Sequence, residues 1–102
     1  MHKMQVLCPA PADPAAFLSY YEAHHLPLAR RLPGLRAERH VRPSMLSPGA
    51  AVFLIWEGVF DDRQAMFAAL KSDIGQAVAQ DVPNYSPAGA TMLHYPIEGA
   101  GS

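Results

Sequence analysis

Hydrophobic and polar residues alternate along this chain in blocks separated by turn residues, and the period within each block predicts its structure. Residues 3–8 mix β-branched and long apolar side chains and stop at two prolines, which cannot continue a sheet ladder, so they predict a strand. Asp13 then has the position of an N-cap. Pro14 follows in the first turn of a predicted helix, whose apolar and aromatic residues recur at helical spacing to about His25.

Pro27 interrupts this helical pattern. A proline has no backbone N–H and disfavours the α region for the residue before it, here Leu26. We therefore expect the helix to end near His25, and the chain to bend or restart as a separate turn before the next strand. The bend would place the histidines at a helix end.

The rest of the chain contains three further strand patterns and one helix pattern. The run at residues 51–60 is almost unbroken in apolar side chains, as is typical of a strand covered on both faces. A pair of aspartates caps the second helix, whose apolar residues recur with a period of about 3.6. The predicted elements are strands at residues 35–41, 51–60 and 90–95, a helix from Asp62 to about Gln80, and a loop over residues 80–89.

The order strand, helix, strand, strand, helix, strand predicts an α+β fold of the ferredoxin-like βαββαβ type, with a four-stranded antiparallel sheet and both helices on one face. At 102 residues the chain is expected to form one domain, residues 1–102. Among the consecutive residues 53–56, all large and apolar, two should face away from the helices. Leaving each in water forfeits roughly 1.5–3 kcal/mol. We therefore expect a homodimer in which two sheets pack face to face into a barrel.

Composition narrows the classes of function. The formal net charge is −1 and the pI about 6.5, with no basic stripe, so nucleic acid is not expected as a partner. No apolar run is long enough to span a bilayer, and the start of the chain lacks the apolar core of a signal peptide. Cys8 is the single cysteine, so no internal disulfide can form and a cytoplasmic location is expected.

The first predicted helix contains two tyrosine–histidine pairs at a spacing of four, which places each pair on one helix face. Only one pair can point fully inward. The two alternative inward faces are Phe17, Tyr20 and His24, or Leu18, Tyr21, His25 and Leu28. The second set is slightly favoured because it continues past Pro27. His25 and Tyr21 are therefore the catalytic candidates, with Tyr21 as the orienting or donor partner.

A histidine near a helix C-terminus has its cationic form favoured by the helix dipole and disfavoured by burial, so His25 could act as a general acid or base near neutral pH. The alternative is structural, with His25 donating a hydrogen bond to a loop carbonyl. No carboxylate is obviously placed to orient it: Glu22 lies on another helix face and Glu57 could point either way.

Ligand contacts are expected from Tyr20, Trp56, Asn84 and Tyr85. Asn84 and Tyr85 offer an amide and a phenol on the predicted loop, although an Asx-type turn and a core lid are the more ordinary uses of such residues. Trp56 could line a pocket or belong to the core. The histidines lack metal-site spacing and no phosphate-binding or nucleophile motif occurs, so neither a metal nor another cofactor is implied.

Three segments together resemble the EthD family of the dimeric α+β barrel superfamily: YYEAHHLPLARRLPGLR, FDDRQAMFAALKSDIGQAVAQDVPNY and GATMLHY. The resemblance covers nearly the whole chain, and it makes His25 the family-type histidine and His24 an additional one. It implies a ferredoxin-like dimer and a role in small-molecule catabolism, such as ethyl tert-butyl ether degradation alongside a cytochrome P450 system. Relatives in the superfamily include cofactor-free monooxygenases, muconolactone isomerase and polyketide cyclases, which bind ligands between sheet and helices.

Two functions are therefore expected as alternatives. The first is a cofactor-free isomerase, cyclase or monooxygenase of ether, aromatic or xenobiotic catabolism, acting on a small apolar molecule with His25 as general acid/base. The second is a non-catalytic accessory or ligand-carrier protein for a partner oxygenase. A purely structural dimer with filled cores is a third, weaker interpretation.

Overall fold

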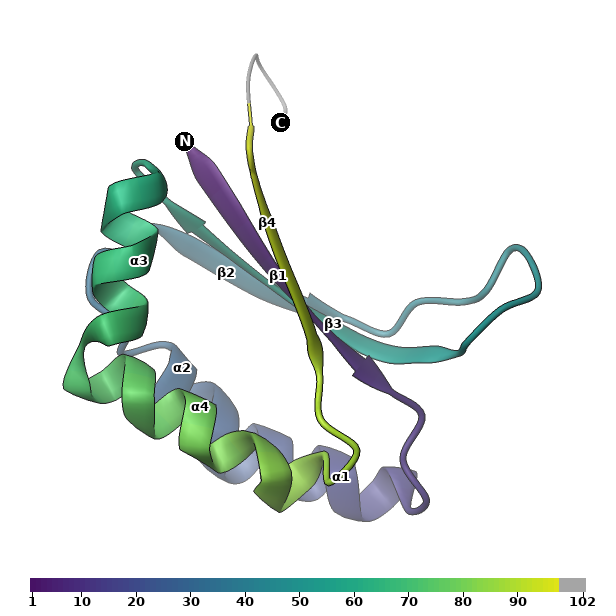
Figure 1. Cartoon of the computed structure of the whole chain (residues 1–102). Coiled ribbons are helices and arrows are strands. Elements are labelled where there is room, and N and C mark those ends of the chain that lie inside the picture. The colour runs from purple at the N-terminus through teal and green to yellow at the C-terminus, as the bar shows by residue number, and fades with distance from the viewer. Residues whose placement is uncertain (98–102) are drawn as a thin grey trace.

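The computed structural model describes residues 1–97, which form a four-stranded antiparallel sheet covered by helices on one face (Figure 1). The strand order is β2-β3-β1-β4, with every neighbouring pair antiparallel, which confirms the ferredoxin-like α+β fold. The elements are β1 His2–Pro9, α1 Pro14–Tyr20, the π-helical turn η1 Tyr21–His25, α2 Leu26–Ala29, β2 Ala37–Val41, β3 Val52–Phe60, α3 Arg63–Lys71, α4 Asp73–Tyr85 and β4 Thr91–Pro96.

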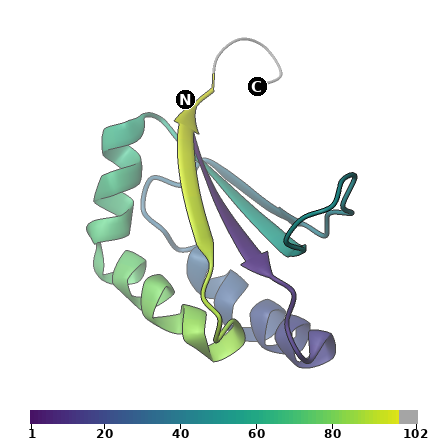
Figure 2. The ribbon, with the colours of Figure 1, turned by 45° about the vertical axis from the view of Figure 1, so that its right-hand side comes forward.

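The hydrophobic core lies between the sheet and the helices. Alternate residues of the two central strands point toward the helices, as the period of two in a strand requires. They pack against the inward faces of the helices, and Figure 2 shows these as one layer beside the sheet. The buried sheet residues of this core are Met4, Cys8, Leu54, Trp56 and Phe60. Among residues 1–97, no helix combines the length and hydrophobicity that crossing a bilayer would require.

The helical conformation continues past His25 into α2, so the prediction that the helix ends near His25 is wrong. Leu26 keeps α-helical angles (φ −58°, ψ −46°), and its N–H donates to the carbonyl of Tyr21, five residues back, which is the bond of a π-helix. A proline ring clashes with the carbonyl four residues before it in a regular α-helix. The wider turn η1 immediately before Pro27 lets the chain continue helically into α2.

The second helix was also predicted incorrectly, because it is two helices and extends further. Ser72 separates α3 from α4, and its hydroxyl oxygen accepts the Gly75 N–H at 3.0 Å as the N-cap of α4. A side chain at Gly75 would collide with backbone carbonyl oxygens of α3, so the small residue permits this close junction. Helix α4 ends only at Tyr85, which makes Asn84 and Tyr85 helical rather than part of a loop.

Strand β3 sends fewer large side chains to the open face of the sheet than expected. The register between β1 and β3 shifts at Cys8/Pro9, which is a β-bulge. Phe53 packs edge-on against Phe17 of α1, with ring centroids 5.0 Å apart, and so joins the helix side. Of residues 53–56, only Ile55 remains on the open face.

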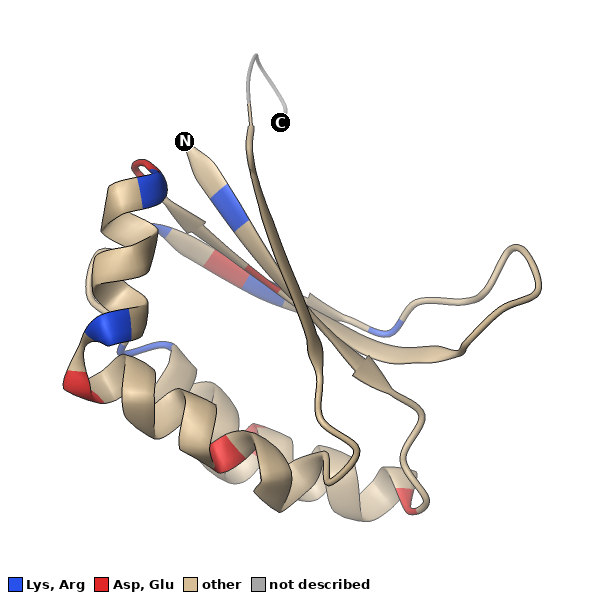
Figure 3. Cartoon of the chain, in the orientation of Figure 1, with Lys and Arg blue, Asp and Glu red and all other residues tan. Residues whose placement is uncertain are grey.

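The open face has an ionic centre around Glu57 of β3; Figure 3 shows where charged residues occur along the strands. The Glu57 carboxylate accepts hydrogen bonds from Gln5 (2.6 Å) and Arg39 (2.7 Å), and Lys3 lies 3.6 Å away. Burial by itself would raise the pKa of Glu57, but these positively charged and hydrogen-bonding neighbours keep it below its usual value. Glu57 therefore points away from the helices and cannot orient His25.

Candidate functional site

A cavity of about 310 Å³ lies between the sheet and the helices, and its walls are largely apolar. The polar side chains that reach it come from the first helical segment and from the end of α4. Its lining includes Trp56 and Met92 from the sheet, Leu70 from α3, Val82 and Tyr85 from α4, and Tyr21 and His25 from η1. A cavity of this size and character is typical of a site for a small molecule.

The central feature of the site is a line of three hydrogen-bonded side chains at this cavity wall. His25 Nδ1 lies 2.9 Å from Asp81 Oδ2, and His25 Nε2 lies 3.2 Å from the Tyr85 hydroxyl. An ionised carboxylate can only accept, so Nδ1 carries the proton and donates to Asp81. Nε2 then has a lone pair and accepts the Tyr85 O–H. His25 is only 5% exposed, so its imidazole is shielded from bulk water.

Asp81 is itself fixed by two further donors. The Tyr20 hydroxyl donates to Asp81 Oδ1 at 2.6 Å, and the Asn84 side-chain amide donates to the same oxygen at 3.0 Å. Burial favours the neutral acid, but the hydrogen bonds from Tyr20, Asn84 and His25 outweigh it and keep the pKa of Asp81 below its usual value. Asp81 therefore remains a carboxylate that orients the imidazole.

Electrostatics at the site favour a neutral histidine. Burial holds the pKa of His25 below its ordinary value of 6.5, and the neighbouring Asp81 carboxylate opposes this only in part. The sequence predicts two opposing effects on His25, the helix dipole favouring the cation and burial disfavouring it; in the structure burial has the larger effect on its pKa. Burial also raises the pKa of Tyr21 and of Tyr85, so both remain phenols. The site thus has an imidazole lone pair beside neutral O–H donors. These are the groups that general-base catalysis requires.

The turn η1 determines which side chains face the cavity. It buries Tyr21 and His25, leaves His24 exposed, and stacks the Tyr21 ring on the His25 ring with centroids 5.2 Å apart. The inward face combines the two sets considered from the sequence. Tyr21 and His25 of the favoured set are buried, but so is Phe17 of the other set, whereas Leu18 and Leu28 are only half-buried. Tyr20 is half-buried and contacts the Asp81 oxygen that does not bind His25.

Trp56 lines the opposite wall of the cavity and is fixed in place by its neighbours. Its indole N–H donates to Glu38 Oε2 at 3.0 Å, and Arg30 in turn donates to Glu38 Oε1 at 2.9 Å. A Cβ at Gly58 would lie 2.7 Å from a ring carbon of Trp56, so only glycine leaves room for the indole.

The structure brings four of the residues expected from the sequence to the cavity and leaves two outside it. Tyr21, His25, Trp56 and Tyr85 line the cavity, whereas Tyr20 and Asn84 act on it only through Asp81. Asp81 itself was missed. The sequence feature that could have identified Asp81 is its position four residues before Tyr85. If residues 81–85 are helical, Asp81 and Tyr85 lie on the same face of the helix. Among residues 1–97, no group of three or more metal-ligating side chains is arranged to bind a metal ion.

Comparison with known proteins finds relatives that cover most of this chain. The family model described as the EthD domain matches residues 10–87. An uncharacterized 11.0 kDa protein in the thcB-thcC intergenic region of Rhodococcus erythropolis is 30% identical over 95 residues, which are 91% of each chain. The crystal structure of an EthD family protein from Bacillus halodurans is 28% identical, with a TM-score of 0.87 over 96% of this chain and 99% of that one.

A more distant structure shares the fold alone. It is described as a dimeric ferredoxin-like protein of unknown function from Thermobifida fusca. It is 9% identical, with a TM-score of 0.69 over 94% of this chain and 89% of that chain.

The lowered pKa of His25 predicts a pH-dependent stability. Because the folded protein binds this proton more weakly than the unfolded chain, the free energy of unfolding is greatest above pH 6.5. It should decrease as the pH falls from there through the folded-state pKa. Each unit of pKa lowering corresponds to about 1.4 kcal/mol. His25→Gln should reduce this decrease, measured by urea denaturation at about pH 7.5 and about pH 5.

His24→Gln is the matched control, because His24 is the adjacent histidine and is exposed. His2, whose pKa burial also lowers, contributes in the same pH range in all three proteins. An equal loss of stability in wild type and in both variants would show that His25 is not held neutral by the fold.

Proposed function

This chain belongs to the EthD domain family, and we propose that it binds a small, largely apolar molecule in the sheet–helix cavity and acts on it by proton transfer at His25. The observation that supports this proposal is the line Asp81–His25–Tyr85 at the wall of an apolar cavity. A carboxylate that orients a neutral, buried imidazole is the arrangement of a general base.

In the proposed reaction, His25 Nε2 removes a proton from an acidic O–H or C–H of the ligand, which takes the place of the Tyr85 hydroxyl at that nitrogen. The proton stays on Nε2, and the resulting imidazolium is stabilised by Nδ1–H donation to Asp81. The Tyr85 and Tyr21 hydroxyls are the available donors to the developing oxyanion. Isomerisation, cyclisation and cofactor-free oxygenation by an oxidoreductase can all begin with this step.

A second function, a non-catalytic carrier for a partner oxygenase such as a cytochrome P450 system, is favoured by one observation. Both ring nitrogens of His25 already have protein partners, Asp81 and Tyr85. A histidine satisfied on both sides can serve as part of the cavity wall. The two functions differ in whether the proton at Nε2 exchanges with a bound ligand.

Hydrogen exchange of 2-tetralone in D₂O tests this difference. It is a compact apolar ketone with acidic α-hydrogens, and NMR follows their replacement by deuterium. The wild-type protein should accelerate exchange, and His25→Gln should lower the rate by about 10²–10⁴-fold, the usual range for general-base catalysis. Asp81→Asn should lower it by removing the group that orients the ring.

His24→Gln should exchange tetralone at the wild-type rate. Binding is followed separately through the fluorescence of Trp56, the single tryptophan of the chain, which lines the cavity. Bound tetralone that exchanges no faster than in buffer would contradict the catalytic proposal and support the carrier.

We also propose that the protein assembles as a homodimer through the open face of its sheet. Leu7, Ile55 and Val59 are half-buried apolar residues on this face of a single chain, around the ionic centre of Glu57 and Arg39. A two-fold axis brings the same patch of each copy together, so adjacent opposite charges can pair across it. The distant structural relative from Thermobifida fusca is described as dimeric, which supports assembly as a dimer.

Ile55→Glu should convert the dimer to a monomer, because it replaces an apolar contact of the proposed interface by a second carboxylate beside Glu57. Native mass spectrometry measures the subunit count. Ala15→Glu, on the exposed surface of α1, should remain dimeric. A wild-type protein that is monomeric at micromolar concentration would contradict the proposed assembly.

A further inference from the structure

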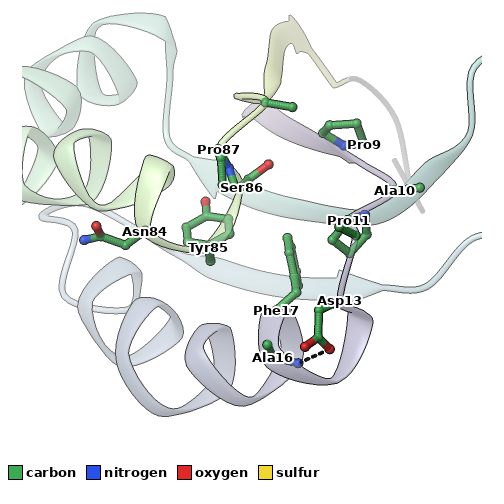
Figure 4. Close-up of a pocket in the computed structure, with 12 residues that line it drawn as sticks. Pro9, Ala10, Pro11, Asp13, Ala16, Phe17, Asn84, Tyr85, Ser86 and Pro87 are labelled. Carbon is green, nitrogen blue, oxygen red and sulfur yellow. Dashed lines mark hydrogen bonds between the residues drawn. The ribbon is translucent and has the colours of Figure 1, made fainter.

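A second cavity, of about 430 Å³, lies at the end of the domain beside the proton-transfer site (Figure 4). One wall is the connection from β1 to α1 with the first turn of α1, and the other is the last turn of α4 with the residues after it. We call this the proline groove, since Pro9, Pro11 and Pro87 line it. Proline fixes its own φ angle, so these walls are preorganised.

The polar side chains of the proline groove are already used within the protein. Asp13 accepts the Ala16 N–H at 3.1 Å as the cap of α1, the Asn84 amide donates to Asp81, and the Ser86 hydroxyl donates to the Gly89 carbonyl at 2.7 Å. The remaining surface comes from alanine, proline and aromatic side chains. Such a surface suits an alkyl or aryl group rather than a charged one.

Tyr85 connects the proline groove to the site of proton transfer, because it lines both cavities. Its hydroxyl bonds to His25 on the inner side, and its ring meets Phe17 at right angles, with centroids 5.3 Å apart. Phe17 lines the groove. A molecule that displaces the Tyr85 hydroxyl from His25 therefore lies beside a ring that also lines the proline groove.

We propose that the proline groove binds the apolar tail of the same ligand whose polar head lies against His25. This inference rests on the proposed function of the inner cavity and specifies its ligand class: an elongated molecule with an acidic O–H or C–H at one end and an alkyl or aryl chain at the other. The chain lies across the Tyr85 ring. Each methylene buried in the groove should tighten binding about fourfold.

The probes are phenol and 4-hexylphenol, which share an acidic hydroxyl and differ in the tail. Binding to the full-length protein is followed by the fluorescence of Trp56 in the inner cavity. The test variant is Ala16→Leu, which fills the proline groove from α1 and keeps the backbone N–H that Asp13 caps. Ala15→Leu is the matched control, since Ala15 is an exposed neighbour that lines neither cavity.

In wild type and in Ala15→Leu, 4-hexylphenol should bind at least about tenfold tighter than phenol. In Ala16→Leu, the affinity for phenol should stay within about twofold of wild type, while the gain from the hexyl chain is lost. Equal affinities of Ala16→Leu and Ala15→Leu for 4-hexylphenol would contradict the proposal that the groove binds the tail. The proposed binding in the inner cavity would be unaffected by that result. If phenol does not change the fluorescence of Trp56, the proposed binding in the inner cavity is contradicted, and the groove proposal, which rests on it, is contradicted too.

Discussion

The hydrogen bond between Asp81 and His25 is the interaction on which the proposed chemistry depends. It joins the last part of α4 to η1, two segments that are 56 residues apart in sequence. Because a carboxylate can only accept, the bond fixes the proton on Nδ1 and leaves the lone pair of Nε2 facing Tyr85. The donors Tyr20 and Asn84 keep Asp81 ionised. The direction of the hydrogen bonds at His25 therefore follows from one half-buried carboxylate, that of Asp81.

The fold makes this bond possible through two local departures from regular structure. The π-helical turn η1 relieves the clash that Pro27 would cause, and it presents Tyr21 and His25 to the cavity. The junction at Ser72 ends α3 and starts α4 in a new direction, so that α4 reaches the histidine. The sheet contributes the other wall, and Gly58 leaves the space that the Trp56 indole occupies.

The order of strands and helices along the chain and the burial of His25 could be predicted from the sequence, because each depends on local periodicity. The fold class followed from that order of elements. The bulge that turns Phe53 toward Phe17 depends on pairing between two strands, so a period-two pattern within one strand cannot show it. Asp81 was missed for a similar reason. Proline near a helix end normally marks a boundary, and the segment around Pro83 was therefore assigned to a loop. The Asp81 carboxylate can reach His25 only because residues 81–85 are helical and lie beside η1.

The protonation of His25 is the most direct test of this account. A long-range ¹H–¹⁵N spectrum of labelled protein at neutral pH distinguishes the two neutral tautomers from the cation. The account predicts a neutral imidazole with its proton on Nδ1 and an unprotonated Nε2, and a loss of this preference in Asp81→Asn. A cationic His25 at neutral pH, or a proton on Nε2, would contradict it, because Nε2 would then have no lone pair with which to accept a proton.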